Sequence, residues 1–101
     1  MTMNYRELFP LHDPAEKYDF KSCSSMEDFI LEVIKIYFSE TDLRVKESCL
    51  SVYMAFRDHY PSYIKNLDQN TKVKLDLDIE TASAKIIKLR RIVIAAISKV
   101  A

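Results

Sequence analysis

The side chains that could act as acids or bases are few in this chain, and their spacing argues against catalysis. Two histidines each neighbour an aspartate, as His12–Asp13 and Asp58–His59. Adjacent residues on a helix point about 100° apart, so neither pair is arranged to share a proton. We expect both pairs to be surface polar residues at the ends of elements, and we expect the protein not to be an enzyme.

The two cysteines also lack the neighbours that nucleophilic catalysis or metal binding requires. Cys49 falls in an apolar stripe and lies ten residues before His59, on a different side of a helix. A reactive thiol needs a nearby base or positive charge. Zinc sites use close pairs such as C-x-x-C, and the order His12, Cys23, Cys49, His59 contains none. We expect a buried Cys49 and no metal ion or cofactor.

Glycine is absent from all 101 residues. Phosphate-binding loops and Rossmann turns need glycine because the main chain approaches the ligand closely. Nucleotide enzymes built on those loops are therefore excluded. Tight β-turns and bulges also rely on glycine, so its absence favours an all-α fold.

Charge is balanced over the whole chain but not along it. Residues 1–71 carry 8 Lys/Arg and 12 Asp/Glu, whereas residues 72–101 carry 7 and 3. On a helix, Lys85 and Lys88 lie on one side with Arg91 flanking them, in line with Lys74 and Lys99. Such a strip can bind an acidic protein or phosphates, although a solvated face or ion pairs within the molecule would also explain it.

An acidic protein is the preferred partner for this strip, and nucleic acid is the alternative. Sequence-specific DNA-binding proteins usually have basic domains and recognisable motifs, whereas this chain has a net charge of zero. The sequence predicts a non-catalytic protein–protein interaction or regulatory module that acts through helix faces. A nucleic-acid-binding regulator using the basic C-terminal helix is the second reading.

Two helices are predicted in the first two thirds of the chain. The first spans residues 25–39, with Ser24 and Glu27 at capping-box spacing. It is apolar around most of its circumference, which is typical of a central helix. The second runs from a cap at Thr41 or Asp42 to about residue 59, with Ser51 on its exposed side. Pro61 ends it and begins a short helical piece.

The last third of the chain is ambiguous between helix and strand. Residues 72–80 alternate apolar and charged side chains, which is the period of a strand. Beyond Ile79, apolar residues keep a 4-3 spacing for three heptads. We favour one long helix from about Leu75 or Asp78 to the end of the chain; a short extended segment across a dimer is the alternative. The helix has a second apolar edge, Ile87 and Ile94, which suggests self-association, although wide burial within a four-helix arrangement would also explain it.

Residues 1–24 are expected to form an extended arm, because Pro10 and Pro14 interrupt any helix there. The arm is rich in aromatic residues, which favours packing on the helices or on a second subunit. The predicted fold is therefore a small antiparallel bundle of three long helices and a short one, covering residues 25–101. Its expected core consists of Phe29, Val33, Ile36, Val52, Phe56, Ile86, Leu89 and Val93.

The expected compartment is the cytoplasm. The start of the chain has no basic segment followed by an apolar run. Its longest strongly apolar stretch near the end, residues 92–97, is far shorter than the roughly 20 residues that a membrane helix needs. Two cysteines do not make a disulfide framework. We therefore expect a protein with reduced thiols, no membrane span and the capacity to form a homodimer.

Overall fold

The computed structural model describes residues 5–10, 18, 20 and 22–100, with the side chain of residue 100 left out of the description. All regular structure in this part of the chain is helical, which confirms the all-α prediction. The elements are η1 (Tyr5–Leu8), α1 (Met26–Ser39), α2 (Leu43–His59), η2 (Pro61–Ile64), α3 (Gln69–Glu80) and α4 (Ala84–Val100).

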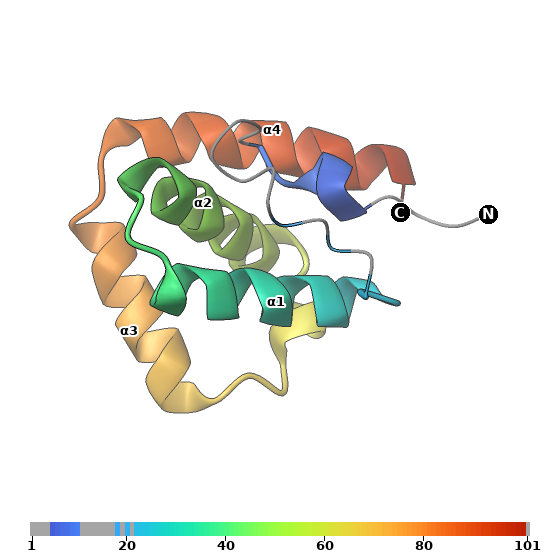
Figure 1. The fold of residues 1–101 in the computed structure, drawn as a ribbon, viewed down its shortest axis with the longest axis horizontal. Helices are drawn as coiled ribbons and strands as arrows, with labels where there is room; N and C mark the ends of the chain where they lie inside the picture. The colour runs from blue at the N-terminus through green and yellow to red at the C-terminus, as the bar shows by residue number, and fades with distance from the viewer. Residues whose placement is uncertain (1–4, 11–17, 19, 21, 101) are drawn as a thin grey trace.

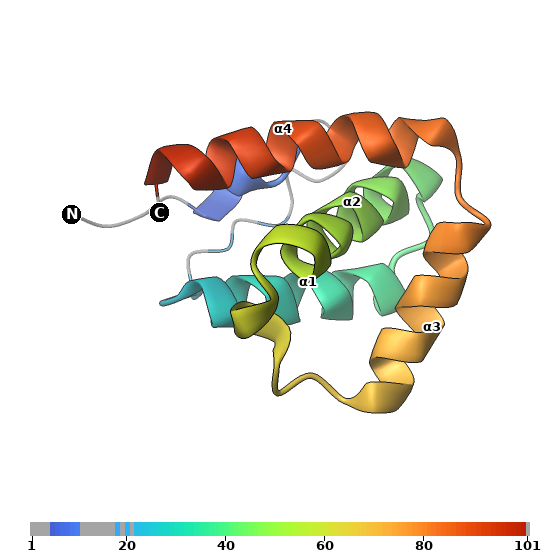
Figure 2. The same ribbon diagram turned by 180° about the vertical axis from the view of Figure 1, so that it is seen from behind.

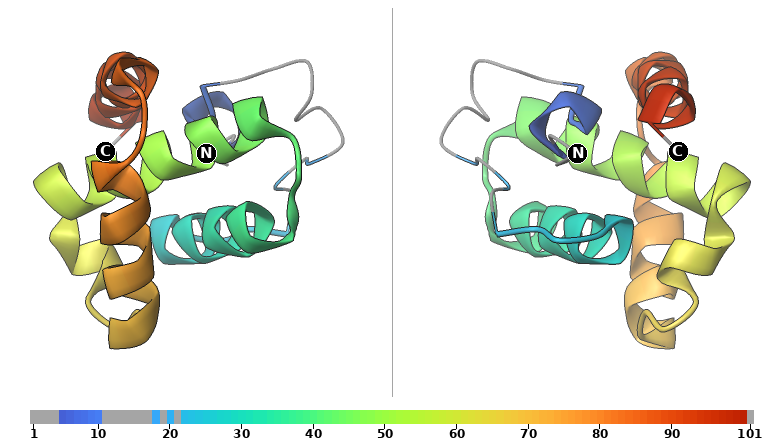
Figure 3. Two further views of the ribbon diagram at one scale, coloured as in Figure 1. Left: turned by 90° about the vertical axis from the view of Figure 1, so that its left-hand side faces the viewer. Right: turned by 90° about the vertical axis from the view of Figure 1, so that its right-hand side faces the viewer.

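Helix α2 lies at the centre of the molecule, between α1 and α4 (Figure 1). The prediction that residues 25–39 form the central helix is wrong, because α2 packs against both α1 and α4, and Leu31 and Phe38 of α1 are about half exposed. In Figure 3, α4 is seen nearly end-on while α2 is seen from its side, so α2 lies across α4. The antiparallel bundle arrangement is therefore not confirmed.

Small side chains on α2 let α4 approach closely. Ser48, Ser51 and Ala55 share one face of α2 and are fully buried. The Ser51 hydroxyl lies within hydrogen-bond distance of the carbonyl oxygens of Glu47 (2.8 Å) and Ile86 (3.1 Å), and its one proton is shared between these two acceptors beneath α4. The expectation that Ser51 faces solvent is wrong for this reason. Ile86, Val93 and Ile97 are buried on the other side of this contact.

The last third of the chain forms two helices rather than one. The carboxylate of Asp68 accepts a hydrogen bond from the backbone N–H of Thr71 (3.1 Å) and caps α3. Helix α3 ends at Glu80, and α4 begins at Ala84. A single helix starting near residue 75 or 78 is therefore wrong, and so is the extended alternative for residues 72–80. The chain turns between Glu80 and Ala84 because only then can α4 lie on α2.

The N-cap of α1 lies one residue later than predicted. Ser25 is its N-cap, and its hydroxyl oxygen accepts from the backbone N–H of Asp28 at 3.2 Å. The Asp28 carboxylate in turn accepts from the backbone N–H and the hydroxyl of Ser24. This reciprocal pattern resembles a capping box, with Asp28 in the place that the sequence pattern assigned to Glu27.

The described part of the N-terminal arm packs into the core and includes one helical turn, η1. Tyr5, Leu8, Phe9 and Phe20 are buried, and η1 lies against α4 (Figure 2). The rings of Tyr5 and Phe20 contact Phe29 of α1, with centroid distances of 5.9 and 5.2 Å. Phe20 has a φ of 55°, which costs a non-glycine residue about 1–3 kcal/mol. Burial of its ring among these aromatic side chains offsets that cost.

The expected core is confirmed except at one position. Leu89 stays partly exposed, and the other seven residues are buried, namely Phe29, Val33, Ile36, Val52, Phe56, Ile86 and Val93.

Candidate functional site

The candidate catalytic side chains do not come together in the described residues. Burial raises the pKa of the Cys49 thiol to about 12, so it carries no thiolate at neutral pH. Asp58 forms ion pairs with Arg57 (2.9 Å) and Arg90 (2.8 Å) rather than with its neighbour His59. His12 and Asp13 lie outside the described residues. Residues 5–10, 18, 20 and 22–100 contain no group of three or more His, Cys, Asp or Glu side chains that could hold a metal ion.

The predicted partner-binding residues lie on the outer face of α4. Lys85, Lys88 and Arg91 are all exposed. At 100° per residue, Lys85, Lys88, Lys99 and the exposed Ile92 fall within about 60° of one another, and Arg91 flanks them. We call these five residues the basic face. No acidic residue belongs to α4.

The predicted self-association residues lie on a second edge of α4, beside Arg91 and away from the three lysines of the basic face. Ile87 is exposed, whereas Ile94 is partly buried and packs against the core. Ile87 is therefore accessible to a partner at this edge, whereas much of the Ile94 side chain is buried within the molecule.

A groove that the sequence did not reveal lies where the α1–α2 connection meets the α3–α4 connection. It has a volume of about 660 Å³. Leu50 and Ile86 are buried residues of its lining, and Phe38 and Leu43 line it with 50% and 73% of their surface exposed. We call this feature the corner groove. Its lining comes from four helices, so no local sequence pattern indicates it.

A polar network built on Tyr37 and Asp78 holds one side of the corner groove. The Tyr37 hydroxyl donates to Asp78 at 2.6 Å, and the Lys74 ammonium donates to the same carboxylate at 2.7 Å. Lys46 donates to the carbonyl oxygen of Tyr37 and lies 4.2 Å from the centre of its ring. Burial, together with Asp78, raises the pKa of Tyr37 above its ordinary value, so Tyr37 remains a donor.

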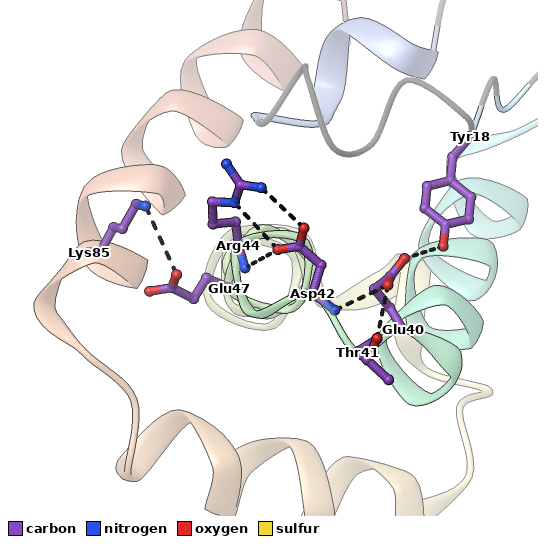
Figure 4. A network of polar contacts seen from close by, with 7 residues as sticks. All are labelled: Tyr18, Glu40, Thr41, Asp42, Arg44, Glu47 and Lys85. Atoms are coloured by element: carbon purple, nitrogen blue, oxygen red, sulfur yellow. Dashed lines mark hydrogen bonds and ion pairs between the residues drawn. The ribbon is translucent and has the colours of Figure 1, made fainter.

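A second network fixes the turn between α1 and α2, as Figure 4 shows. The Glu40 carboxylate accepts from the backbone N–H groups of Thr41 (2.9 Å) and Asp42 (3.1 Å), and Tyr18 donates to it. Asp42 caps α2 by accepting from the backbone N–H of Arg44 at 2.9 Å. These bonds stabilise the α1–α2 turn that lies between Phe38 and Leu43.

Glu47 connects the corner groove to the basic face. Its carboxylate lines the groove and lies 3.9 Å from the Lys85 ammonium (Figure 4). The Ser83 hydroxyl, just before α4, also donates to Glu47 at 3.1 Å. The first turn of α4 is thereby held beside the groove.

No helix in the described part of the chain combines the length and apolarity needed to cross a bilayer. Comparisons with protein-family models, with curated proteins and with solved structures found no match to this chain.

Proposed function

We propose that the chain is a non-catalytic protein-binding module that receives an acidic partner on the basic face of α4. The observation that carries this proposal is the imbalance of charge on that face. Arg90 and Lys85 approach acidic side chains of α2, whereas Lys88, Arg91 and Lys99 have no ion pair among the described residues. Exposed cations without partners attract and orient an acidic protein.

Exposed apolar side chains on the same helix favour a protein over a nucleic acid. Ile92 lies between the lysines of the basic face, and Ile87 is exposed on the neighbouring edge beside Arg91. Protein interfaces combine an apolar centre with a polar rim. Phosphate contacts would leave both isoleucines in water, whereas a protein partner would bury Ile92.

Charge reversal tests the proposal. A variant with Lys85→Glu, Lys88→Glu and Arg91→Glu should keep its helical circular dichroism spectrum and lose the partners that the wild type captures from its native lysate. The matched control is Lys35→Glu, Lys65→Glu and Lys72→Glu, which reverses three lysines outside α4. Quantitative mass spectrometry of the captured proteins compares the two. Capture that the α4 variant retains at the wild-type level contradicts the proposal.

The second candidate function is binding of nucleic acid by the same cations. Lys88, Arg91 and Lys99 are the observation that favours it, because unpaired cations also release counterions from a phosphate backbone. Duplex DNA titrated into the protein at increasing salt separates the two functions. Affinity that falls steeply with salt and disappears in the α4 variant supports nucleic-acid binding and argues against the protein partner.

A further inference from the structure

We propose that the corner groove receives one bulky apolar side chain from an acidic segment of the partner protein, whose carboxylates then contact Lys74, Lys85 and Lys88. This inference rests on the proposed function and adds the place and the chemistry of the anchor.

The groove has the composition of an anchor pocket. Phe38 and Leu43 are among the most exposed large apolar residues in the described part of the chain, and both line the groove over the buried Leu50 and Ile86. Its volume of about 660 Å³ falls within the roughly 300–1,000 Å³ of typical ligand pockets. Binding energy at protein interfaces is concentrated where a large side chain fills such a pocket. An apolar anchor would remove Phe38 and Leu43 from water.

The charged residues at the groove indicate whether the partner segment that carries the anchor is acidic or basic. The side chain of Lys74 is 59% exposed, whereas that of its partner Asp78 is 20% exposed. The side chain of Lys85 is 51% exposed, and that of Glu47 is 27% exposed. In both pairs the cation projects toward solvent and the carboxylate lies deeper. An approaching segment therefore meets ammonium groups first, and each ammonium has further N–H donors for a second carboxylate.

The same arrangement disfavours a phosphate inside the groove. Glu47 and Asp78 line it together with Lys46 and Lys74, so the lining carries no excess of positive charge that would hold a phosphate. An apolar side chain needs no such excess, and its acidic neighbours would remain at the rim. The combination favours a peptide with an uncharged anchor and acidic flanks over a nucleic acid.

The groove is also continuous with the basic face. Lys85 approaches Glu47 at the edge of the groove, and Lys88 lies one turn further along α4. A segment anchored beside Phe38 can therefore pass over the first turns of α2, which line the groove, and place its acidic residues along α4. One partner segment can occupy both surfaces.

Peptide titration followed by NMR tests this inference. The probe is an acetylated peptide with one phenylalanine between two pairs of glutamates, added to the ¹⁵N-labelled full chain. We expect amide shifts around Phe38, Leu43 and the first turn of α4. Replacing the peptide's phenylalanine with serine at unchanged charge should weaken binding about tenfold, the factor that corresponds to 1.4 kcal/mol.

Variants of the protein show which surface binds the anchor. The double variant Phe38→Ala and Leu43→Ala should lower the affinity for the phenylalanine peptide. The loss should be about as large as that caused by replacing the peptide's phenylalanine with serine. These side chains are exposed, so we expect the variant to fold; its circular dichroism spectrum checks this. The matched control is Leu31→Ala, an exposed leucine of α1 outside the groove. It should leave the affinity unchanged.

Each alternative outcome contradicts a defined part of the argument. Equal affinity for the serine and phenylalanine peptides, with shifts confined to α4, overturns the groove and leaves the proposed function standing. A lysine-flanked peptide or duplex DNA that binds as tightly as the glutamate-flanked peptide overturns the acidic character of the segment. A titration without any amide shift, for either peptide at millimolar concentration, contradicts both the groove and the basic face as peptide sites.

Discussion

For some individual side chains of this protein, the sequence pattern alone is sufficient to predict burial. Phe29, Val33 and Phe56 are buried as the helical spacing predicts, because the apolar stripe of an amphipathic helix faces the core. Ser51 shows the opposite case. A serine in a helix is usually placed at the surface, but here its small size and its bond to the Ile86 carbonyl fit it beneath α4. Only the three-dimensional contact shows this.

The two central phenylalanines should dominate the stability of the fold. Phe29 and Phe56 are fully buried, and their rings lie 6.2 Å apart. Phe29→Ala or Phe56→Ala should each lower the free energy of unfolding by about 3–5 kcal/mol, since each leaves a cavity in a packed core. Urea denaturation followed by circular dichroism measures the change. Leu31→Ala on the outer side of α1 is the control. If both phenylalanine variants lose less than about 1 kcal/mol of unfolding free energy, the assignment of these residues to the core is refuted.

The end of α3 and the start of α4 could not be predicted from the sequence pattern alone. The apolar 4-3 spacing continues through Ile79, Ala82 and Ile86, and no glycine or proline marks the end of α3. The break is decided by tertiary packing, because α4 must turn to cover the small residues of α2. The corner groove could not be predicted for the same reason. Its contact between Tyr37 and Asp78 joins residues 41 positions apart, and no local pattern carries that information.

Helix α3 should be the least protected helix in hydrogen exchange. Leu75 is its one buried residue, and Val73 and Leu77 face solvent. Polar bonds hold it to the rest of the molecule, including that between Tyr37 and Asp78. A helix with few buried apolar contacts opens with a low free energy. We expect the amides of α3 to exchange at least about tenfold faster than those of α2, measured by NMR. Protection equal to that of α2 would contradict this.

The attachment of α3 should also weaken in acid. Partial burial tends to raise the pKa of Asp78, but the hydrogen bonds from Lys74 and Tyr37 outweigh burial and lower it from its ordinary value of 3.8. A lowered pKa stabilises the fold at pH values above 3.8, and this contribution is lost as the pH falls through the pKa of the folded state. Asp78→Asn should therefore reduce the loss of unfolding free energy between neutral pH and about pH 3.

Denaturation at a series of pH values measures this effect. Glu80→Gln, an exposed position at the end of the same helix, is the control and should keep the wild-type profile. An Asp78→Asn profile that matches the wild type throughout would show that the contact does not hold α3.

At the scale of the whole molecule, apolar surface remains on all four helices. In the described residues, the exposed large apolar side chains are Leu31, Phe38, Leu43, Val73, Leu77, Ile87 and Ile92. A chain of this length buries a smaller fraction of its surface than a larger domain does, so part of this exposure follows from size alone. Phe38 and Leu43 gather at the corner groove, and Ile92 lies within the basic face. Ile87 lies outside the corner groove and beside Arg91 at the border of the basic face.

Ile87 should support self-association of the chain. It is exposed on an edge of α4 beside Arg91, and the three lysines of the basic face lie about 100° or more away around the helix. Ile94 is partly buried, so Ile94→Glu would damage the core as well as the edge, and Ile87→Glu alone is the cleaner variant. Light scattering over a range of concentrations should show a dimer for the wild type and a monomer for Ile87→Glu. The matched control is Ile92→Glu, which places the same charge on the basic face and should leave the dimer intact. A wild type that remains monomeric at high concentration rules out this role for Ile87.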